Sequence, residues 1–386
     1  MIVVIADDIT GAAEIGGVAR RFNLSNMIVR DLNSCLPREK EVVIYDTNSR
    51  EKETAESIRS IKALKRLIKN TPVSKLFKKT DSVCRGNITD ELCALMTLKN
   101  AKKTLFTPAS PSTNRVVREG HLFLNSKPIH KSHFKKDPTF PAQSSCIVDI
   151  LGYHSDSKVI SCKINKVKTF TEGIIVADVE NETDLLNLTK MIEPETLAAG
   201  SAAFFEQWLS GKHKISKSPV NASNPSLPMP WLITIGSRHD INQKQLEELK
   251  KNEHCLVEID ALNNENLKAT DTNAIVNSAN YIVVIKTGDI VNKDICSKLA
   301  KLTYKLHNSI KPKTLIISGG ETAENIFDTF GWHTVEVSHE IEQGVVVLDT
   351  KTKTRITLKP GSYGKKSFYL DILRRGFNSQ VQQVMF

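Results

Sequence analysis

Short runs of apolar residues alternate along this chain with longer, charged stretches in which apolar residues recur at the spacing of a helix. The stretches with helical spacing are residues 55–69, 243–250 and 295–308. Strands that alternate with helices favour α/β layers with mostly parallel sheets, and short, largely apolar strands indicate sheets that are covered on both faces. The predicted strands are residues 2–5, 42–45, 76–78, 104–107, 174–176, 232–235, 281–285 and 314–317.

The length of the chain predicts more than one such domain, because 386 residues exceed the roughly 150 residues of a typical domain. Residues 210–230 contain four prolines among serine, asparagine and lysine residues, a composition typical of a linker. We therefore predict an N-terminal domain over residues 1–210, a linker over 211–230 and a C-terminal domain over 231–386. Each domain is expected to be a mostly parallel sheet flanked by helices. Residues 120–145 show little periodicity and are predicted to form a long excursion of the first domain.

Charge and cysteine content narrow the range of partners. The 53 Lys and Arg residues against 43 Asp and Glu give a net charge of +10, which favours anionic partners such as phosphates and carboxylates. Aromatic residues make up only 6% and the lysines are scattered, which argues against a nucleic-acid-binding protein. The seven cysteines form no CxxC pair and are expected to be reduced. With no signal peptide and no run of about 18 apolar residues, we expect a cytoplasmic protein outside membranes.

Polar residues follow the first three predicted strands. Asp7 and Asp8 follow the strand at residues 2–5 and precede a Thr-Gly pair that opens a predicted helix. Ligands of open α/β sheets bind at such carboxyl edges, where strand ends and helix N-termini meet. Two acids there are suited to holding sugar hydroxyls, to accepting a proton or to binding Mg²⁺. The alternative is that an aspartate only caps the helix.

Two further polar strand ends lie in the same predicted domain. Residues 46–50 end in Arg50, whose planar guanidinium suits a carboxylate, although a solvated surface arginine is the alternative. Residues 78–82 bring Lys79, Thr80, Asp81 and Ser82 to the end of the third strand. We expect the three strand ends to form one anion-binding pocket.

The C-terminal half carries small residues and glycines at its strand ends. Ser237 follows the strand at residues 232–235, a Gly319-Gly320 pair follows residues 314–317, and residues 361–364 form another glycine turn. Glycine lets the backbone approach a phosphate and direct amide groups at it, although a tight strand-to-helix connection is the alternative. The run GSYGKKS does not satisfy the Walker A pattern, and no GxGxxG follows a strand.

Taken in order, these segments resemble the four-carbon acid sugar kinase family, long described only as a domain of unknown function. The resemblance spans nearly the whole chain, and its most specific motifs are ADDITGA and KKTDSVCRGN. The segments that carry it are ADDITGAAE (6–14), DTNSR (46–50), KKTDSVCRGNI (78–88), TPASPSTNR (107–115), DPTFP (137–141), AAGSAAFFE (198–206), IGSRHDINQ (235–243), SGGETA (318–323) and LKPGSYG (358–364).

The resemblance implies an N-terminal domain that binds a sugar acid and a C-terminal domain that binds ATP. Phosphate would pass to the terminal hydroxyl of an acid such as D-threonate, D-erythronate or 3-oxo-tetronate. The substrate-binding residues that it implies are Asp8, Arg50, Lys79, Thr80, Asp81 and Ser82. The nucleotide-binding residues that it implies are Ser237, Gly319, Gly320, Glu321, Thr322, Gly361, Ser362 and Gly364.

Phosphoryl transfer needs positioning and charge neutralisation, so ATP and Mg²⁺ are the expected cofactors. Arg50 and Lys79 would hold the substrate carboxylate, Asp8 would accept the proton with Asp81 as the rival base, and Glu321 would bind the metal or the ribose. The sequence does not identify the metal ligands or the stereoisomer of the acid, and it leaves open whether the protein forms a homo-oligomer. Two other functions remain: an ATP-independent sugar-phosphate isomerase or hydrolase, and a sensor that binds a sugar acid without catalysis.

Overall fold

The computed structural model describes residues 1–32, 37–137, 139–152, 157–211, 213, 225, 227–252, 256–261, 281–286, 293–350 and 353–375. The chain divides into two compact units, Met1–Val220 and Asn221–Phe386. Most of the predicted linker, residues 211–230, lies outside the described residues, so the predicted domain limits remain predictions. Each unit is described by itself below.

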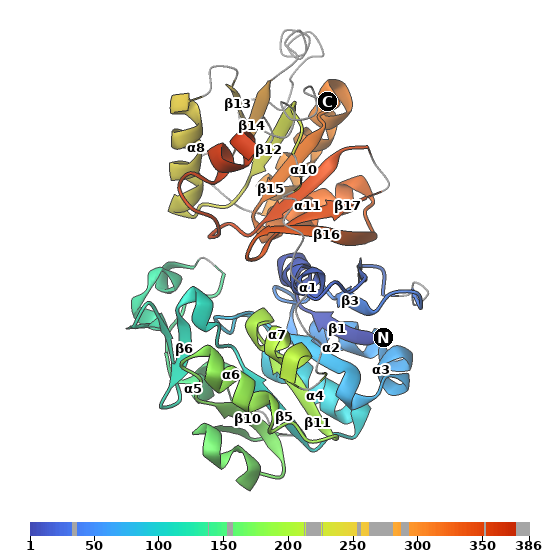
Figure 1. The fold of residues 1–386 in the computed structure, drawn as a ribbon, viewed down its shortest axis with the longest axis vertical. Coiled ribbons are helices and arrows are strands. Elements are labelled where there is room, and N and C mark those ends of the chain that lie inside the picture. Colours follow the sequence, from blue (N-terminus) through green and yellow to red (C-terminus); the bar gives the residue numbers. More distant parts are fainter. Residues whose placement is uncertain are drawn as a thin grey trace. The chain divides into compact units, whose positions relative to one another are not determined.

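The N-terminal unit is built on a sheet in which neighbouring strands run parallel (Figure 1). Its central strands are buried on both faces, as their apolar sequences predict. The order across the sheet is β2 (Asn26–Val29), β3 (Val42–Asp46), β1 (Ile2–Ala6), β4 (Leu76–Lys79), β11 (Thr196–Gly200), β5 (Lys103–Thr107), β10 (Gly173–Ala177) and β9 (Val159–Cys162).

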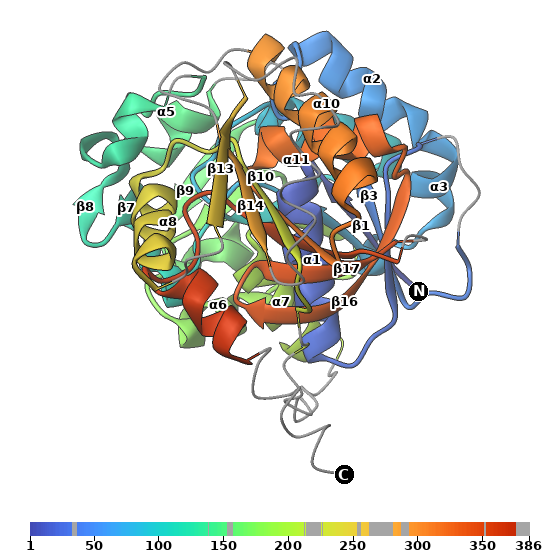
Figure 2. The same cartoon turned by 90° about the horizontal axis from the view of Figure 1, so that it is seen from above.

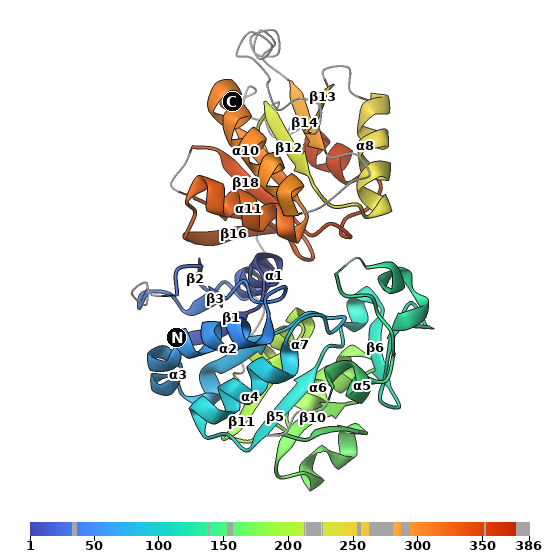
Figure 3. The same ribbon diagram turned by 180° about the vertical axis from the view of Figure 1, so that it is seen from behind.

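Helices cover the two faces of this sheet. One group comprises α1 (Ile9–Arg21), α6 (Glu182–Thr189) and α7 (Ala202–Gly211), which pack side by side. The other comprises α2 (Thr54–Ala63), α3 (Lys65–Asn70) and α4 (Ile88–Lys99), which lie in front of the sheet in Figure 3. The single helix expected over residues 55–69 is two helices, because Leu64 leaves helical geometry with a ψ of 9°. Its apolar spacing continues across this break, since Ile61, Leu64 and Ile68 are all buried.

The predicted excursion at residues 120–145 contains more order than its sequence suggested. It contributes β7 (His121–Leu124) and β8 (Lys127–Pro128) to a small antiparallel sheet with β6 (Arg115–Arg118). The short helices of this unit are η1 (Val73–Lys75), η2 (Pro111–Thr113), η3 (Ile129–Lys131), η4 (His133–Lys136), α5 (Ile147–Leu151) and η5 (Ile164–Thr169).

The C-terminal unit is a second α/β layer. Its first five strands in spatial order are parallel, whereas β17 runs antiparallel to both of its neighbours. In Figure 2, α8 (Asp240–Asn252) and α10 (Lys293–Ile310) lie on opposite sides of this sheet, and α11 (Gly320–Phe330) packs beside α10. The order is β13 (Leu256–Asp260), β14 (Ile282–Lys286), β12 (Trp231–Ile235), β15 (Thr314–Ser318), β18 (Arg355–Lys359), β17 (Val345–Asp349) and β16 (Thr334–Glu342).

The core of the C-terminal unit joins the parallel strands to the segment that follows β18. Trp231, Ile233 and Ile316 pack with Phe368 and Tyr369, all of them fully buried. The predicted α/β class is therefore confirmed in both units. In the described part of the chain, no helix has the length and apolar character needed to cross a membrane.

Candidate active site

The acidic turn after β1 begins α1. Asp8 is the N-cap residue of this helix, and its Oδ1 accepts a hydrogen bond from the Gly11 amide at 2.8 Å. Its Oδ2 accepts a second bond from the Thr10 hydroxyl. The helix-cap interpretation is therefore correct for Asp8. Capping is only part of its role, because Arg50 also donates to this carboxylate.

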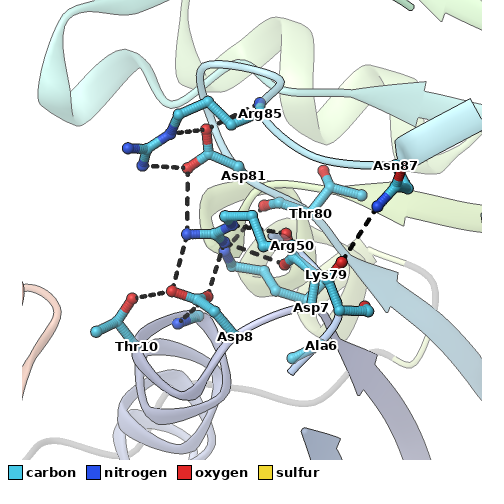
Figure 4. Close-up of polar contacts among 12 residues, drawn as sticks. Ala6, Asp7, Asp8, Thr10, Arg50, Lys79, Thr80, Asp81, Arg85 and Asn87 are labelled. Atoms are coloured by element: carbon cyan, nitrogen blue, oxygen red, sulfur yellow. Dashed lines mark hydrogen bonds and ion pairs between the residues drawn. The ribbon is translucent and has the colours of Figure 1, made fainter. Parts of the chain in front are cut away.

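Arg50 lies between the carboxylates of Asp7 and Asp8 (Figure 4). Its Nε and Nη2 donate to Asp7 at 2.8 and 3.1 Å, and its Nη1 and Nη2 donate to Asp8 at 2.8 and 2.7 Å. Nη1 is also 3.8 Å from Oδ1 of Asp81. The side chain of Arg50 is only 13% exposed, so it is not a solvated surface arginine. Two strand ends that were predicted to converge therefore do so through this guanidinium.

The charges in this cluster stabilise one another. Burial alone would raise the pKa of Asp7, but Arg50, Lys78 and Lys79 hold it below its usual value. Burial would likewise lower the pKa of Arg50, but Asp7, Asp8 and Asp81 raise it well above its usual value. The cluster therefore keeps Asp7 ionised and Arg50 protonated at neutral pH.

The third strand end reaches the cluster through Asp81 and Arg85. Arg85 donates from Nε and Nη2 to the two oxygens of Asp81, at 2.9 and 3.0 Å. The backbone amides of Val83 and Arg85 donate to the same carboxylate. Burial would raise the pKa of Asp81, but Arg85 and Arg50 lower it well below its usual range. Asp81 is therefore a weak proton acceptor.

Arg85 was not among the predicted site residues, although it lies in the third motif. Besides Asp81, it donates to Oδ2 of Asp137 at 3.1 Å, and its guanidinium lies 5.6 Å from the ring centre of Phe134. Asp137 and Phe134 belong to the excursion, so Arg85 joins this segment to the cluster. The four-residue spacing from Asp81 was the one signal in the sequence that pointed to Arg85.

Lys79, Thr80 and Ser82 complete the third strand end. The Lys79 ammonium is 3.3 Å from Glu14 and donates to the Thr80 carbonyl at 2.9 Å. A Cβ on Gly11 would lie 3.2 Å from this ammonium, which therefore lies against the start of α1. Thr80 is buried, and its hydroxyl has no hydrogen-bond partner among the residues that the structure describes. Ser82 is half-buried, and within those residues it makes no hydrogen bond to the cluster.

A buried network behind the cluster holds the segment that carries Arg50. The Lys78 ammonium is 2.7 Å from Glu91 of α4, and both side chains are almost inaccessible. Glu91 also accepts hydrogen bonds from Ser57, at 2.7 Å, and from Ser49. Ser49 in turn lies 2.7 Å from the Thr47 hydroxyl. Sequence reasoning missed Glu91, which lies on the buried face of α4, a helix that was not among the predicted helical stretches.

The C-terminal motifs follow three adjacent strand ends. In the sheet, Ile235 of β12 is paired with Ser318 of β15, and Ser318 is paired with Lys359 of β18. The turns that follow are in contact: a Cβ on Gly361 would lie 1.9 Å from the Ser237 hydroxyl, and one on Gly319 would lie 3.2 Å from the Ser237 amide nitrogen. Gly319 also has a φ of +117°, which favours glycine.

The remaining predicted nucleotide residues lie around this point. Gly320, Glu321 and Thr322 form the first turn of α11, where amide groups have no partner within the helix. Thr322 is buried, and its hydroxyl lies against Gly236. Gly364, with a φ of +86°, lies against Gln245 and Phe368, so it shapes the last turn from behind. In the described ranges, no group of three His, Cys, Asp or Glu side chains is arranged to hold a metal ion.

Both units match known families. The family model of a sugar-binding N-terminal domain matches residues 2–208, more than half of the chain. The model of a nucleotide-binding C-terminal domain matches residues 232–369. The chain belongs to the four-carbon acid sugar kinase family. The polar and glycine turns described above thus lie in domains named for the two ligands of such a kinase.

Individual members of this kinase family match at low identity. A 3-oxo-tetronate kinase of Haemophilus influenzae is 24% identical over 96% of this chain and 98% of its own length. A D-threonate kinase of Salmonella typhimurium is 28% identical, over 47% of this chain and 46% of its own length.

Solved structures show the same fold. A Haemophilus influenzae protein of the DUF1537 family superposes with a TM-score of 0.73 at 19% identity, over 97% of this chain and all of its own. A Salmonella typhimurium protein described as a putative tRNA synthase superposes with a TM-score of 0.76 at 18% identity, over 97% of this chain and 98% of its own. At such identities the likeness concerns the fold alone.

Proposed function

We propose that this protein transfers a phosphoryl group from ATP to the terminal hydroxyl of a four-carbon sugar acid. The family and its named kinases make the chain a phosphotransferase. The observation that carries the proposal is the pairing of two different strand-end sites in one chain: a cluster of buried charges in the sugar-binding domain and adjoining glycine turns in the nucleotide-binding domain. The relatives suggest D-threonate or 3-oxo-tetronate as the type of acceptor.

In the N-terminal unit, Lys79 and Thr80 are the first contacts that we assign to the sugar acid. The Lys79 ammonium is almost inaccessible and lies at the start of α1, where an anion is favoured. The unpartnered Thr80 hydroxyl gains a hydrogen bond when a substrate oxygen reaches it, which offsets a cost of about 1–3 kcal/mol for a buried polar group without a partner. Ser82 stays a proposed contact at the rim.

Arg50 has a more specific proposed role than its sequence suggested. Asp7 and Asp8 occupy four of the five N–H donors of Arg50, so Arg50 can bind both oxygens of the substrate carboxylate only by giving up a bond, and we assign that exchange to Asp8. The same exchange would expose Asp8 to the attacking hydroxyl. Asp8 is therefore the proposed base, and Asp81 is the weaker candidate because its lowered pKa disfavours protonation.

In the C-terminal unit, the adjoining turns suit a polyphosphate. A Cβ at Gly361 would collide with the Ser237 hydroxyl, and one at Gly319 would crowd the Ser237 backbone, so glycine at these positions lets the three turns pack closely on one another. Gly320, Glu321 and Thr322 offer helix N-terminal amides, which favour phosphate. ATP supplies the phosphoryl group, and Mg²⁺, bound largely through phosphate oxygens, neutralises its charge. Glu321 is the proposed carboxylate for that ion.

The proposal is tested by ADP release from ATP with a panel of tetronates and 3-oxo-tetronates. One acid should give saturable ADP release and a phosphorylated product. Turnover without ATP would favour an isomerase or hydrolase, and ligand-induced stabilisation without product would favour a sensor.

Asp8→Asn tests the proposed base in the same assay. Asparagine keeps the helix cap but cannot take the proton, so we expect kcat to fall by about 10²-fold or more in a folded protein. Asp149→Asn is the matched control, since Asp149 is an exposed residue of α5, and it should leave kcat unchanged. Near-normal turnover of the Asp8 variant would remove Asp8 as the base.

A further inference from the structure

Lys359, at the end of β18, has an unusual environment for a lysine. The residue is fully buried, and its Nζ donates to Oδ1 of Asn242 at 2.8 Å and to the Tyr363 carbonyl at 3.0 Å. The carbonyls of Pro360 and Gly361 lie at 3.3 and 3.5 Å. The ammonium thus faces four oxygen acceptors, three of them from the turn that follows its own strand.

These contacts fix which side of the turn faces inward. When the carbonyl oxygens of a tight turn point at one buried donor, its amide groups are left on the other side, as in the backbone concavities that bind anions. In the part of the chain that the structure describes, the amides of Gly361 and Ser362 donate to no protein acceptor. Gly361 also lies against the Ser237 hydroxyl, so these amides belong to the glycine turns of the proposed nucleotide site.

Asn242 of α8 holds this arrangement from the other side. Its Nδ2 donates to the Gly361 carbonyl at 2.9 Å, and its Oδ1 accepts both from Lys359 and, at 2.8 Å, from the Ser318 hydroxyl. Gln245, one turn later, donates to the Tyr363 and Lys365 carbonyls. One lysine and two amide side chains therefore link the ends of β15 and β18 to α8.

The buried charge of Lys359 is not balanced by a carboxylate. Within the described residues no acidic group lies in ion-pair distance of its Nζ, and burial lowers the pKa of Lys359 to about 7 while Glu342 of β16 acts in the opposite direction. The side chains that face it from α8 and β15 are neutral, and burial keeps nearby Tyr369 protonated by raising its pKa. A bound polyanion would supply the missing negative charge.

We propose that Lys359 is a positioning residue of the nucleotide site: its ammonium gathers the carbonyls of Pro360, Gly361 and Tyr363 and so presents the Gly361 and Ser362 amides, with a positive charge behind them, to a nucleotide phosphate. This inference rests on the proposed function, because it assigns the nucleotide to the C-terminal turns. It adds to the proposed nucleotide site the Lys359 ammonium, which does not itself contact the nucleotide.

The test compares Lys359→Met with Lys366→Met in the full-length protein. Lys366 is the matched control, because it lies in the same segment but is 57% exposed and, among the residues that the structure describes, pairs with Glu248 alone. For Lys359→Met we expect the Kd for ADP to rise about tenfold or more, the loss of at least one charge-assisted interaction. The KM for ATP should rise in parallel while the KM for the sugar acid stays unchanged, a separation that general loss of folding would not give.

A second measurement uses the wild-type protein and does not depend on the variant folding. If the charge of Lys359 responds to phosphate, its pKa rises on binding, so ADP binding at pH 8 takes up protons. This uptake appears as a dependence of the calorimetric enthalpy on the ionisation enthalpy of the buffer. Amide hydrogen exchange at residues 361–364 should also slow when ADP binds.

The outcomes of these experiments distinguish a failure of the proposed function from a failure of the inference about Lys359. Wild-type protein that binds neither ADP nor ATP would overturn the proposed function and this inference with it. Wild-type protein that binds ADP with neither proton uptake nor protection of residues 361–364 would overturn the inference alone. So would a folded Lys359→Met variant with an unchanged Kd for ADP. A raised Kd in that variant, with the Lys366→Met value unchanged, supports it.

Discussion

At the centre of the N-terminal cluster, two adjacent aspartates share a single guanidinium. Arg50 pairs with Asp7 and Asp8 at once, in a place where its side chain is only 13% exposed. Buried ion pairs add little net stability when formed, but removal of one partner leaves an uncompensated charge. The cluster is therefore sensitive to neutral substitution at its centre, whatever ligand it binds.

Arg50→Met tests this sensitivity. Because it leaves two buried carboxylates without their partner, we expect the free energy of unfolding to fall by about 3–5 kcal/mol. Arg118→Met is the control: Arg118 pairs with Glu180 on the surface, both being about half exposed, so its loss should cost about 0–1 kcal/mol. Urea denaturation measures both changes, and equal costs for the two variants would contradict the prediction.

The lowered pKa values of Asp7 and Asp81 predict how stability depends on pH. In the folded protein both groups lose their protons more easily than in the unfolded chain, where an aspartate titrates near pH 4. The stabilisation from their arginine partners is therefore complete above about pH 4 and is lost as the pH falls below it.

Urea denaturation between pH 3 and 7 measures this dependence. In Asp81→Asn, whose amide does not titrate, the loss of stability toward low pH should be smaller than in the wild type. A wild-type free energy of unfolding that stayed constant down to pH 3 would contradict the prediction.

At the scale of elements, Arg85 joins the excursion to the cluster. Arg85 joins Asp81, at the end of β4, to Asp137, just after η4. The short helix η4 also contributes Phe134, which packs against the same guanidinium. A segment of low periodicity is thus fixed beside the proposed acceptor site, where it can shape the pocket for a particular acid.

Asp137→Ala tests that role. Loss of the Arg85 bond should loosen the excursion and raise the KM for the sugar acid by about tenfold, the effect of one charge-assisted hydrogen bond. The KM for ATP should not change. Steady-state kinetics with each substrate varied in turn measures both, and a change confined to the KM for ATP would show that the excursion serves the nucleotide instead.

Most of the central elements could be predicted from the sequence because fully buried parallel strands have a strong signal. The runs at residues 2–5, 42–45, 232–235 and 314–317 became β1, β3, β12 and β15. Strand β16 was missed, since its side chains alternate between buried and partly exposed and it carries charges. The polar strand ends were visible for the same reason as the strands: each followed an apolar run.

The contacts between elements could not be predicted in the same way. Lys78 and Glu91 pair across thirteen positions, and Lys359 and Asn242 pair across 117. Nothing in the local sequence distinguishes such buried charges from solvated ones. Arg50 illustrates the limit: its type suggested a carboxylate partner, but only the fold identified those partners as Asp7 and Asp8.

At the scale of the molecule, each unit carries its own site, so the two ligands should leave separate footprints on the full-length chain. Hydrogen exchange measures this directly. ADP alone should slow exchange at the turns after β12, β15 and β18, and the accepted sugar acid alone should slow it at the turns after β1, β3 and β4. Protection of the N-terminal turns by ADP alone would contradict the assignment of ligands to units.

The aligned ends of β12, β15 and β18 limit where this chain tolerates insertions. Ile235, Ser318 and Lys359 occupy one level across the sheet. One extra residue inside any of these strands would advance its turn by about 3.3 Å and send the following side chain to the opposite face. An insertion in β18 would move Lys359 away from Asn242, and one in β12 or β18 would separate Gly361 from Ser237. Length variation among homologues should therefore accumulate at the opposite, N-terminal ends of these strands, because a change in length there does not shift the aligned C-terminal ends.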